Sequence, residues 1–254
     1  KNNVRYLASD DLKGRLAGSE EEKIYTQKIA DLFKELKLQP AQDKNFIYEF
    51  EYTSGVTLGE GNVFKLLNQG GENVYKVSED FIPLSFSRSG ATQAAPVVFA
   101  GYGIIAPATE KLAAYDSYRG LDVKGKWVLA FRSIPEDISP EQRLHLNMYS
   151  KAQFKATVAK NAGAIGLILV SGPNSQVKTQ LTKLQYDGSS ADTTLSVVSV
   201  TDSVAEKILS FSAGQKSLKD LQTALDKGEQ NDGFEIPNVK VATELMINHQ
   251  KSIG

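Results

Sequence analysis

The chain has 254 residues, 41% hydrophobic and 23% charged, which is enough for one large domain or two smaller ones around a packed core. Its 29 Lys and Arg residues nearly balance its 30 Asp and Glu residues, and a net charge of -1 excludes nucleic-acid binding by bulk electrostatics. The sequence contains no cysteine and no apolar run long enough to cross a membrane, which excludes disulfides, thiol catalysis and a transmembrane helix.

The clearest helix is predicted from about Glu20 to Lys37. Ser19 is a favourable N-cap, Glu22 completes a capping box three residues later, and Pro40 prevents continuation of the helix. The apolar positions of this helix recur at helical spacing and form one stripe: Tyr25, Ile29, Leu32, Phe33 and Leu36.

Strands are predicted on both sides of a polar, glycine-rich stretch. Residues 46–53 alternate between aromatic and mostly polar side chains, which is the period of a strand. Two short strands are expected near residues 62–67 and 74–77, joined by Gly70 and Gly71.

From Pro96 onward, short apolar runs alternate with helical segments. The runs are typical of buried strands, and they cover residues 96–100, 126–131, 165–170 and 195–200. Helices are predicted over residues 139–163, 202–214 and 217–228, and a last strand over residues 239–247. This order indicates an α/β fold in which sheet and helix layers pack together, and it places Trp127 at least partly buried in a central strand.

The segment 101–106, GYGIIA, follows the first apolar run and matches the G-x-G-x-x-A pattern of dinucleotide-binding proteins. Asp122 lies about 20 residues further on, where such a site would have its ribose-binding acid. Pro107, however, falls where the phosphate-binding helix should already be running. The alternative without a ligand is a tight turn in which Gly101 and Gly103 provide the backbone freedom that the turn needs.

Other candidate chemical groups are few. His145 and His249 are far apart in sequence, and neither begins an H-x-D or H-E-x-x-H motif, so they do not predict a zinc site. We expect His145, within a predicted helix, to be a surface or boundary residue, and His249 to lie in a polar tail. Asp116 and Asp122 could form an acid pair for glycoside hydrolysis, but a solvated loop is the favoured interpretation.

The opening of the chain resembles that of secreted zinc-dependent exopeptidases of the aminopeptidase and glutamate-carboxypeptidase type. Their chains often start with an L-x-S-D-x-L-x-G-R-x-x-G stretch, which here comprises Leu7, Ser9, Asp10, Leu12, Gly14, Arg15 and Gly18. PVVFAGYGI, YDSYRGLDVKGKWVLAFR, NAGAIGLILV and LSVVSVT follow in the order of a protease-associated (PA) domain.

The resemblance implies a PA domain with a three-layer swivelling β/β/α fold, inserted into a peptidase domain after that domain's first helix and strand. It divides the chain into residues 1–54 of an incomplete peptidase domain, a PA domain at 55–233, and a return strand and tail at 234–254. It also suggests that Gly101, Tyr102 and Gly103 form a substrate-entrance or interaction loop.

In such peptidases the zinc ligands follow the PA insertion, so the resemblance assigns no catalytic or metal-binding residue to this chain. Zinc is implied for a full-length parent, and this chain alone is expected to be inactive and without a cofactor. The expected partners are the remaining peptidase domain and a peptide or protein substrate. The resemblance implies a secreted or periplasmic protein. Because the sequence starts at Lys1 without a leader, we expect that its signal peptide has been removed.

Two alternatives stay open at this point: a non-enzymatic PA-type interaction module, and a nucleotide-binding oxidoreductase domain. The apolar stripe of residues 20–37 would lack most of the domain that covers it in the family. It predicts a weak homo-oligomer, non-native packing or mobility.

Overall fold

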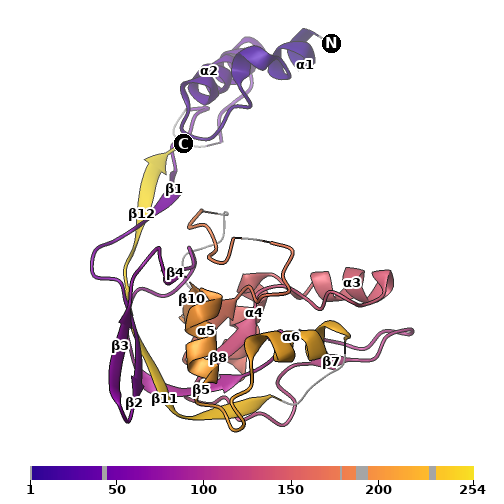
Figure 1. The fold of residues 1–254 in the computed structure, drawn as a ribbon. Helices are drawn as coiled ribbons and strands as arrows, with labels where there is room; N and C mark the ends of the chain where they lie inside the picture. Colours follow the sequence, from indigo (N-terminus) through magenta and orange to yellow (C-terminus); the bar gives the residue numbers. More distant parts are fainter. Residues whose placement is uncertain (1, 42–44, 178, 187–193, 229–232) are drawn as a thin grey trace. The chain divides into compact units, whose positions relative to one another are not determined.

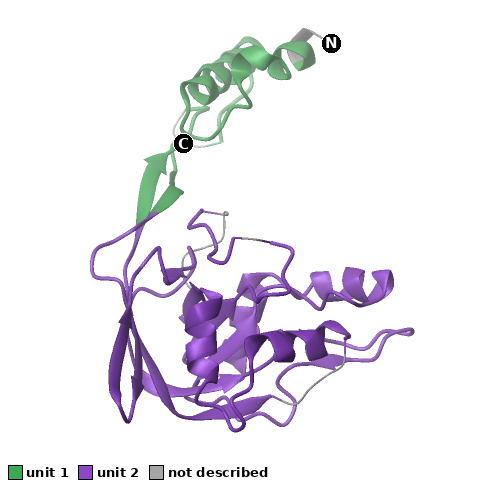
Figure 2. Ribbon diagram, viewed as in Figure 1, with its two compact units in different colours: residues 1–56, 249–254 green, residues 57–248 purple. Residues whose placement is uncertain are grey.

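The computed structural model describes residues 2–41, 45–177, 179–186, 194–228 and 233–254. The chain divides into two compact units (Figure 2). Unit 1 comprises residues 1–56 and 249–254, and unit 2 comprises residues 57–248. These bounds differ from the expected 55–233 at the second boundary, because the strand after residue 233 belongs to the sheet of unit 2.

Unit 1 contains α1 (Asn2–Leu7), the 3-10 helix η1 (Asp10–Leu12) and α2 (Glu20–Glu35) (Figure 1). The predicted start of α2 is confirmed, since the Ser19 hydroxyl accepts a hydrogen bond from the Glu22 amide at 3.1 Å. Of the stripe residues, Phe33 and Leu36 are exposed and the others are half-buried; Ala30 is the buried residue of this helix.

The strand predicted over residues 46–53 is wrong in its bounds. β1 runs over Glu51–Leu58, and the aromatic residues before it lie outside the sheet. Phe46 instead packs edge-on against Phe33 of α2, with ring centroids 5.8 Å apart. The alternation in the sequence therefore reflects aromatic packing on a helix as well as strand pairing.

β1 pairs with β12 (Ile247–Ile253) in a two-stranded ribbon through which the chain leaves and re-enters unit 1. At one end, Phe50 and Gly254 exchange two backbone hydrogen bonds of 3.1 and 3.0 Å. At the other end, the Gly59 amide donates to the Met246 carbonyl at 2.8 Å. The two connections to unit 2 are thus hydrogen-bonded to each other.

Unit 2 is built on an eight-stranded sheet of order β3-β2-β11-β5-β8-β9-β10-β4 (Figure 1). Its strands are β2 (Val63–Asn68), β3 (Gly71–Tyr75), β4 (Phe81–Pro83), β5 (Gly90–Phe99), β8 (Trp127–Phe131), β9 (Gly166–Val170), β10 (Ser196–Val200) and β11 (Phe234–Leu245). β5, β8, β9 and β10, which contain the four apolar runs, are mutually parallel, and the other pairs are antiparallel. β6 (Ile105–Ala106) and β7 (Tyr115–Asp116) form a small separate sheet.

The last predicted strand exists, but its position was not anticipated. β11 lies inside the sheet between β2 and β5, and Ile236, Val239 and Val241 are buried in the core. The expected division that set residues 234–254 apart as a return strand therefore does not match the packing.

The single helix predicted over residues 139–163 is wrong, because the structure has α3 (Pro140–Asn147) and α4 (Ala152–Asn161). The capping box of Ser139 and Gln142 is present as predicted. Tyr149, in the break between the helices, packs against the core and edge-on against His145. α5 (Asp202–Leu209) and α6 (Leu218–Asp226) follow β10.

The core has one cluster on each face of the sheet. Along β8, Trp127, Leu129 and Phe131 belong to one cluster, while Val128 and Ala130 belong to the other. α5 and α6 cover the first face, and α4 contributes Ala156 and Ala159 to the second. The predicted α/β class and the burial of Trp127 in a central strand are confirmed.

Candidate functional site

The loop of Gly101, Tyr102 and Gly103 is a tight turn directly after β5. Gly101 and Gly103 have φ angles of 51° and 61°, in the left-handed region that favours glycine. The Gly101 carbonyl accepts from the Phe131 amide at 2.8 Å, and the Gly103 amide donates to the Ala100 carbonyl at 2.7 Å. Because the chain continues into β6 rather than a helix, the turn lacks the helix N-terminus on which dinucleotide phosphates bind.

All three residues of this turn are buried. The Tyr102 hydroxyl donates a hydrogen bond to the Asp226 carboxylate. Burial raises the pKa of Tyr102 above its ordinary value, and the bond to Asp226 raises it further. The loop was expected to meet substrate or a partner, but in the structure it offers no exposed surface for such a contact.

The Asp226 carboxylate lies at the centre of a buried polar cluster. Besides Tyr102, it accepts hydrogen bonds from the Glu136 amide at 3.2 Å and from the Asn174 side chain at 3.1 Å. The cluster ties α6 to the segments that follow β5, β8 and β9. Because the Asp226 carboxylate accepts hydrogen bonds from three donors within the fold, the cluster holds these loops in place.

Lys155 of α4 is fully buried in unit 2. Its ammonium group lies 2.7, 3.0 and 2.7 Å from the carbonyl oxygens of Phe131, Arg132 and Ser133. Burial lowers the pKa of Lys155, while three acceptors match the three N–H groups that only the charged form presents. The lysine therefore fixes the backbone at the end of β8.

A second polar group lies at the carboxyl ends of the parallel strands, where α/β sheets commonly bind ligands. The Arg132 guanidinium donates to the Ser171 hydroxyl and the Thr179 carbonyl, both at 3.1 Å. Asp202 accepts from the Gly172 amide at 3.0 Å. Partial burial lowers the pKa of Arg132 and raises that of Asp202. These side chains occupy the strand ends and hold the segment after β9.

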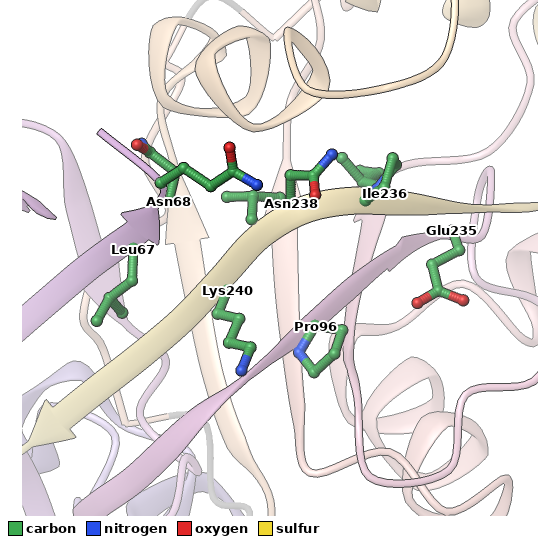
Figure 3. A pocket seen from close by; sticks show the side chains of 10 residues that line it. Leu67, Asn68, Pro96, Glu235, Ile236, Asn238 and Lys240 are labelled. Atoms are coloured by element: carbon green, nitrogen blue, oxygen red, sulfur yellow. The ribbon is translucent and has the colours of Figure 1, made fainter. Parts of the chain in front are cut away.

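A cavity of about 370 Å³ in unit 2 lies where β11 breaks its register with β5 (Figure 3). The pairing shifts between Ile236 and Lys240, and Asn238 has a φ of 62°. The lining combines apolar side chains, amides, a carboxylate and an ammonium: Leu67, Asn68, Gln69, Pro96, Glu235, Ile236, Pro237, Asn238, Val239 and Lys240. Glu235 is already paired with Lys126 at 3.1 Å. The cavity lining therefore offers side-chain amides for hydrogen bonding, together with the Glu235 carboxylate and the Lys240 ammonium group.

The remaining candidates from the sequence have local roles. Asp116 accepts from the Tyr118 amide at 2.8 Å, and Asp122 from the Lys124 amide at 3.1 Å, so each closes its own turn. His145 is buried rather than at the surface, and its Nε2 lies 2.9 Å from the Pro107 carbonyl oxygen. His249 lies in β12 of unit 1.

The resemblance implies zinc for a full-length parent. Within the described part of the chain, no group of three or more His, Cys, Asp or Glu side chains converges as a metal ion would require. The residues at hand therefore do not fit zinc.

No helix in the described residues has the length and apolar character needed to cross a membrane.

The two glycines of the turn after β5 should differ in how much their replacement by alanine lowers the free energy of unfolding. Gly103→Ala should lower the free energy of unfolding by more than about 1 kcal/mol, because a left-handed φ combines with a new Cβ only 3.0 Å from the Ala130 Cβ. Gly101→Ala should cost less, since its Cβ would lie 3.5 Å from the Leu225 methyl groups. Urea unfolding of both variants measures the difference; equal costs would contradict the packing argument.

Comparisons with known proteins give the class of the domain. The PA domain family matches residues 92–208, so the chain contains a PA domain within unit 2. A structure titled as BSAP, a zinc aminopeptidase from Bacillus subtilis, is similar at 19% sequence identity and a TM-score of 0.34. The similarity covers 99% of this chain and 44% of that one, so the chain spans less than half of its length. No curated protein matches the sequence.

Proposed function

We propose that this chain is the PA-bearing part of a secreted or periplasmic zinc-dependent exopeptidase of the aminopeptidase type. In this proposal the PA domain flanks the active-site cleft and modulates substrate access or protein contacts. The zinc and its ligands belong to the remainder of the peptidase domain.

The observation that carries the proposal is the insertion topology. Residues 1–56 and 249–254 form one unit, and the segment containing the PA domain leaves and returns through the paired strands β1 and β12. The resemblance implies a PA domain inserted into a peptidase domain after its first helix and strand, and a segment that leaves and returns through one pair of strands supports this proposal. The opening motif around Gly14 and Arg15 lies in unit 1, which the proposal assigns to the peptidase domain.

The chain by itself should hydrolyse no aminoacyl or peptidyl chromogenic substrate, with or without added zinc. The physical reason is that zinc-dependent hydrolysis needs a metal-bound water and a carboxylate base, and the described residues present no ligand group. The assay compares release of p-nitroaniline with a buffer blank. Zinc-dependent turnover that persists through repurification would contradict this expectation.

The proposal itself is tested with a polypeptide that extends beyond residue 254 to the expected H-x-D motif and the later ligands. It should release p-nitroaniline in a zinc-dependent manner. In that protein, residues 60–245 can be replaced by a two-residue turn, because the Gly59 amide and the Met246 carbonyl are already bonded at 2.8 Å. Removal should change KM for long peptides more than KM for a single aminoacyl anilide, since only long substrates would reach the PA domain.

A second candidate is a non-enzymatic PA-type interaction module, which the PA domain match over residues 92–208 supports equally. It predicts that the extended polypeptide has no ligand set and no turnover, while unit 2 folds unchanged. An equal effect of the deletion on KM for both substrate lengths would argue against the access role but not against the peptidase.

A further inference from the structure

β3 forms one edge of the eight-stranded sheet of unit 2. Gly71, Glu72, Asn73 and Val74 are all exposed, and β3 pairs with β2 on one side only. The opposite edge, β4, has only three residues and ends in Pro83, which has no amide to donate. β3 has five residues and no proline, and Glu72 is its one charged side chain, so it is less protected against edge pairing than β4.

The register of the β2–β3 hairpin shows which backbone groups of β3 point outward. Asn68 pairs with Gly71 across a two-residue loop, and such a closing pair exchanges both backbone hydrogen bonds. Since bonded and non-bonded pairs alternate along an antiparallel ladder, Asn73 and Tyr75 also bond toward β2. The N–H and C=O groups of Glu72 and Val74 therefore point away from the sheet, and no other described segment pairs with them.

We infer that β3 is a self-association edge, on which a second copy of this chain adds its own β3 in antiparallel orientation. The two outward-pointing residues are two positions apart, so a two-fold axis at Asn73 brings Glu72 of each copy opposite Val74 of the other. Both of these pairs are hydrogen-bonded pairs, and together they satisfy all four outward N–H groups and all four outward carbonyls of the two copies.

The side chains permit this pairing. Glu72 faces Val74 rather than another carboxylate, so like charges are not directly opposite. Within its own chain, the Glu72 carboxylate forms an ion pair with the Lys65 ammonium group, with Oε2 and Nζ 3.3 Å apart. Gly71 faces Tyr75, an arrangement in which an aromatic ring covers an edge glycine. A pairing shifted by two residues would lose a hydrogen-bonded pair, which favours the two-fold register.

The contact is small, so the dimer should be weak. Sedimentation velocity of the full chain should show the weight-average coefficient rising over a protein concentration range of about 10–1,000 μM, which corresponds to weak association. Val74→Glu would place carboxylates opposite each other twice and should weaken dimerisation at least about tenfold. Val74→Lys, its matched control, places an ammonium opposite Glu72 of the second copy and should keep or tighten the dimer.

Val74→Pro tests the backbone bonds directly, because it removes an outward N–H while leaving the β2–β3 ladder its own donors. It should abolish the dimer with an unchanged far-UV CD spectrum; a variant that fails to fold is replaced in this role by Glu72→Pro. Phe33→Glu, in the apolar stripe of α2, distinguishes association through β3 from association through α2. If Phe33→Glu abolishes association while Val74→Glu and Val74→Pro do not, or if the chain is monomeric at about 1,000 μM, the β3 inference is wrong. Neither result bears on the proposed peptidase function.

Discussion

Trp127→Ala is expected to lower the free energy of unfolding by about 3–5 kcal/mol, the usual cost of removing a large aromatic side chain from a core. Trp127 is fully buried in β8, one of the four parallel strands in the sheet of unit 2. Urea unfolding followed by far-UV CD measures the change. Phe154→Ala is the matched control, because Phe154 is 49% exposed and should cost far less. Similar losses for both variants would contradict the placement of the indole.

The packing of Trp127 can also be tested from the neighbouring strand, β9. Gly166 of β9 pairs with Trp127, and a Cβ at residue 166 would overlap the six-membered ring of the indole. Gly166→Ala should therefore destabilise unit 2 by about 1–3 kcal/mol or more through overpacking. In the Trp127→Ala background the same change should cost much less, because the ring is gone. Additive costs in this double-mutant cycle would show that the two residues are energetically independent.

Lys155→Met is the second large expected effect. Methionine keeps the apolar stem but removes three donors, which leaves the carbonyls of residues 131–133 without their partner. Each carbonyl left unpaired in the interior costs about 1–3 kcal/mol, so we expect a loss of about 3 kcal/mol or more.

Thermal and urea unfolding measure this loss, with Lys160→Met as the control. Lys160 lies on the same helix but is exposed, so its replacement should change stability by less than about 0.5 kcal/mol. If Lys155→Met were as stable as the original protein, the hydrogen bonds to the three carbonyls would contribute nothing net. Hydrogen exchange at Ser133 and its neighbours should rise in Lys155→Met if the lysine fixes this segment.

Much of unit 2 could be predicted because its parallel strands are buried on both faces. Residues 127–131 and 166–170 therefore appear as continuous apolar runs bounded by turn residues. Helix starts at Ser19, Ser139 and Ser217 were also predictable, because a serine hydroxyl that accepts from an amide three residues later is a local interaction.

The errors concern non-local interactions. The position of β11 between β2 and β5 depends on antiparallel pairing between segments more than a hundred residues apart, which no local pattern encodes. The charge of Lys155 favours a position at the surface, so its burial was missed. Its spacing from Ala152 and Ala159 puts the three residues on one helical face, and this pattern places Lys155 toward the core. The Asp226 cluster joins four separate segments and could not be assembled from spacing alone.

The paired strands β1 and β12 also have a consequence for the order of folding. For unit 1 to form before unit 2, the two parts of unit 1 would have to meet across an unfolded loop of about 200 residues, at a chain-entropy cost of about 4–5 kcal/mol. Once unit 2 has folded, its two ends are already joined between Gly59 and Met246, and most of that cost has been met. Unit 2 therefore acts as an intramolecular template that brings residues 249–254 back to the N-terminal segment.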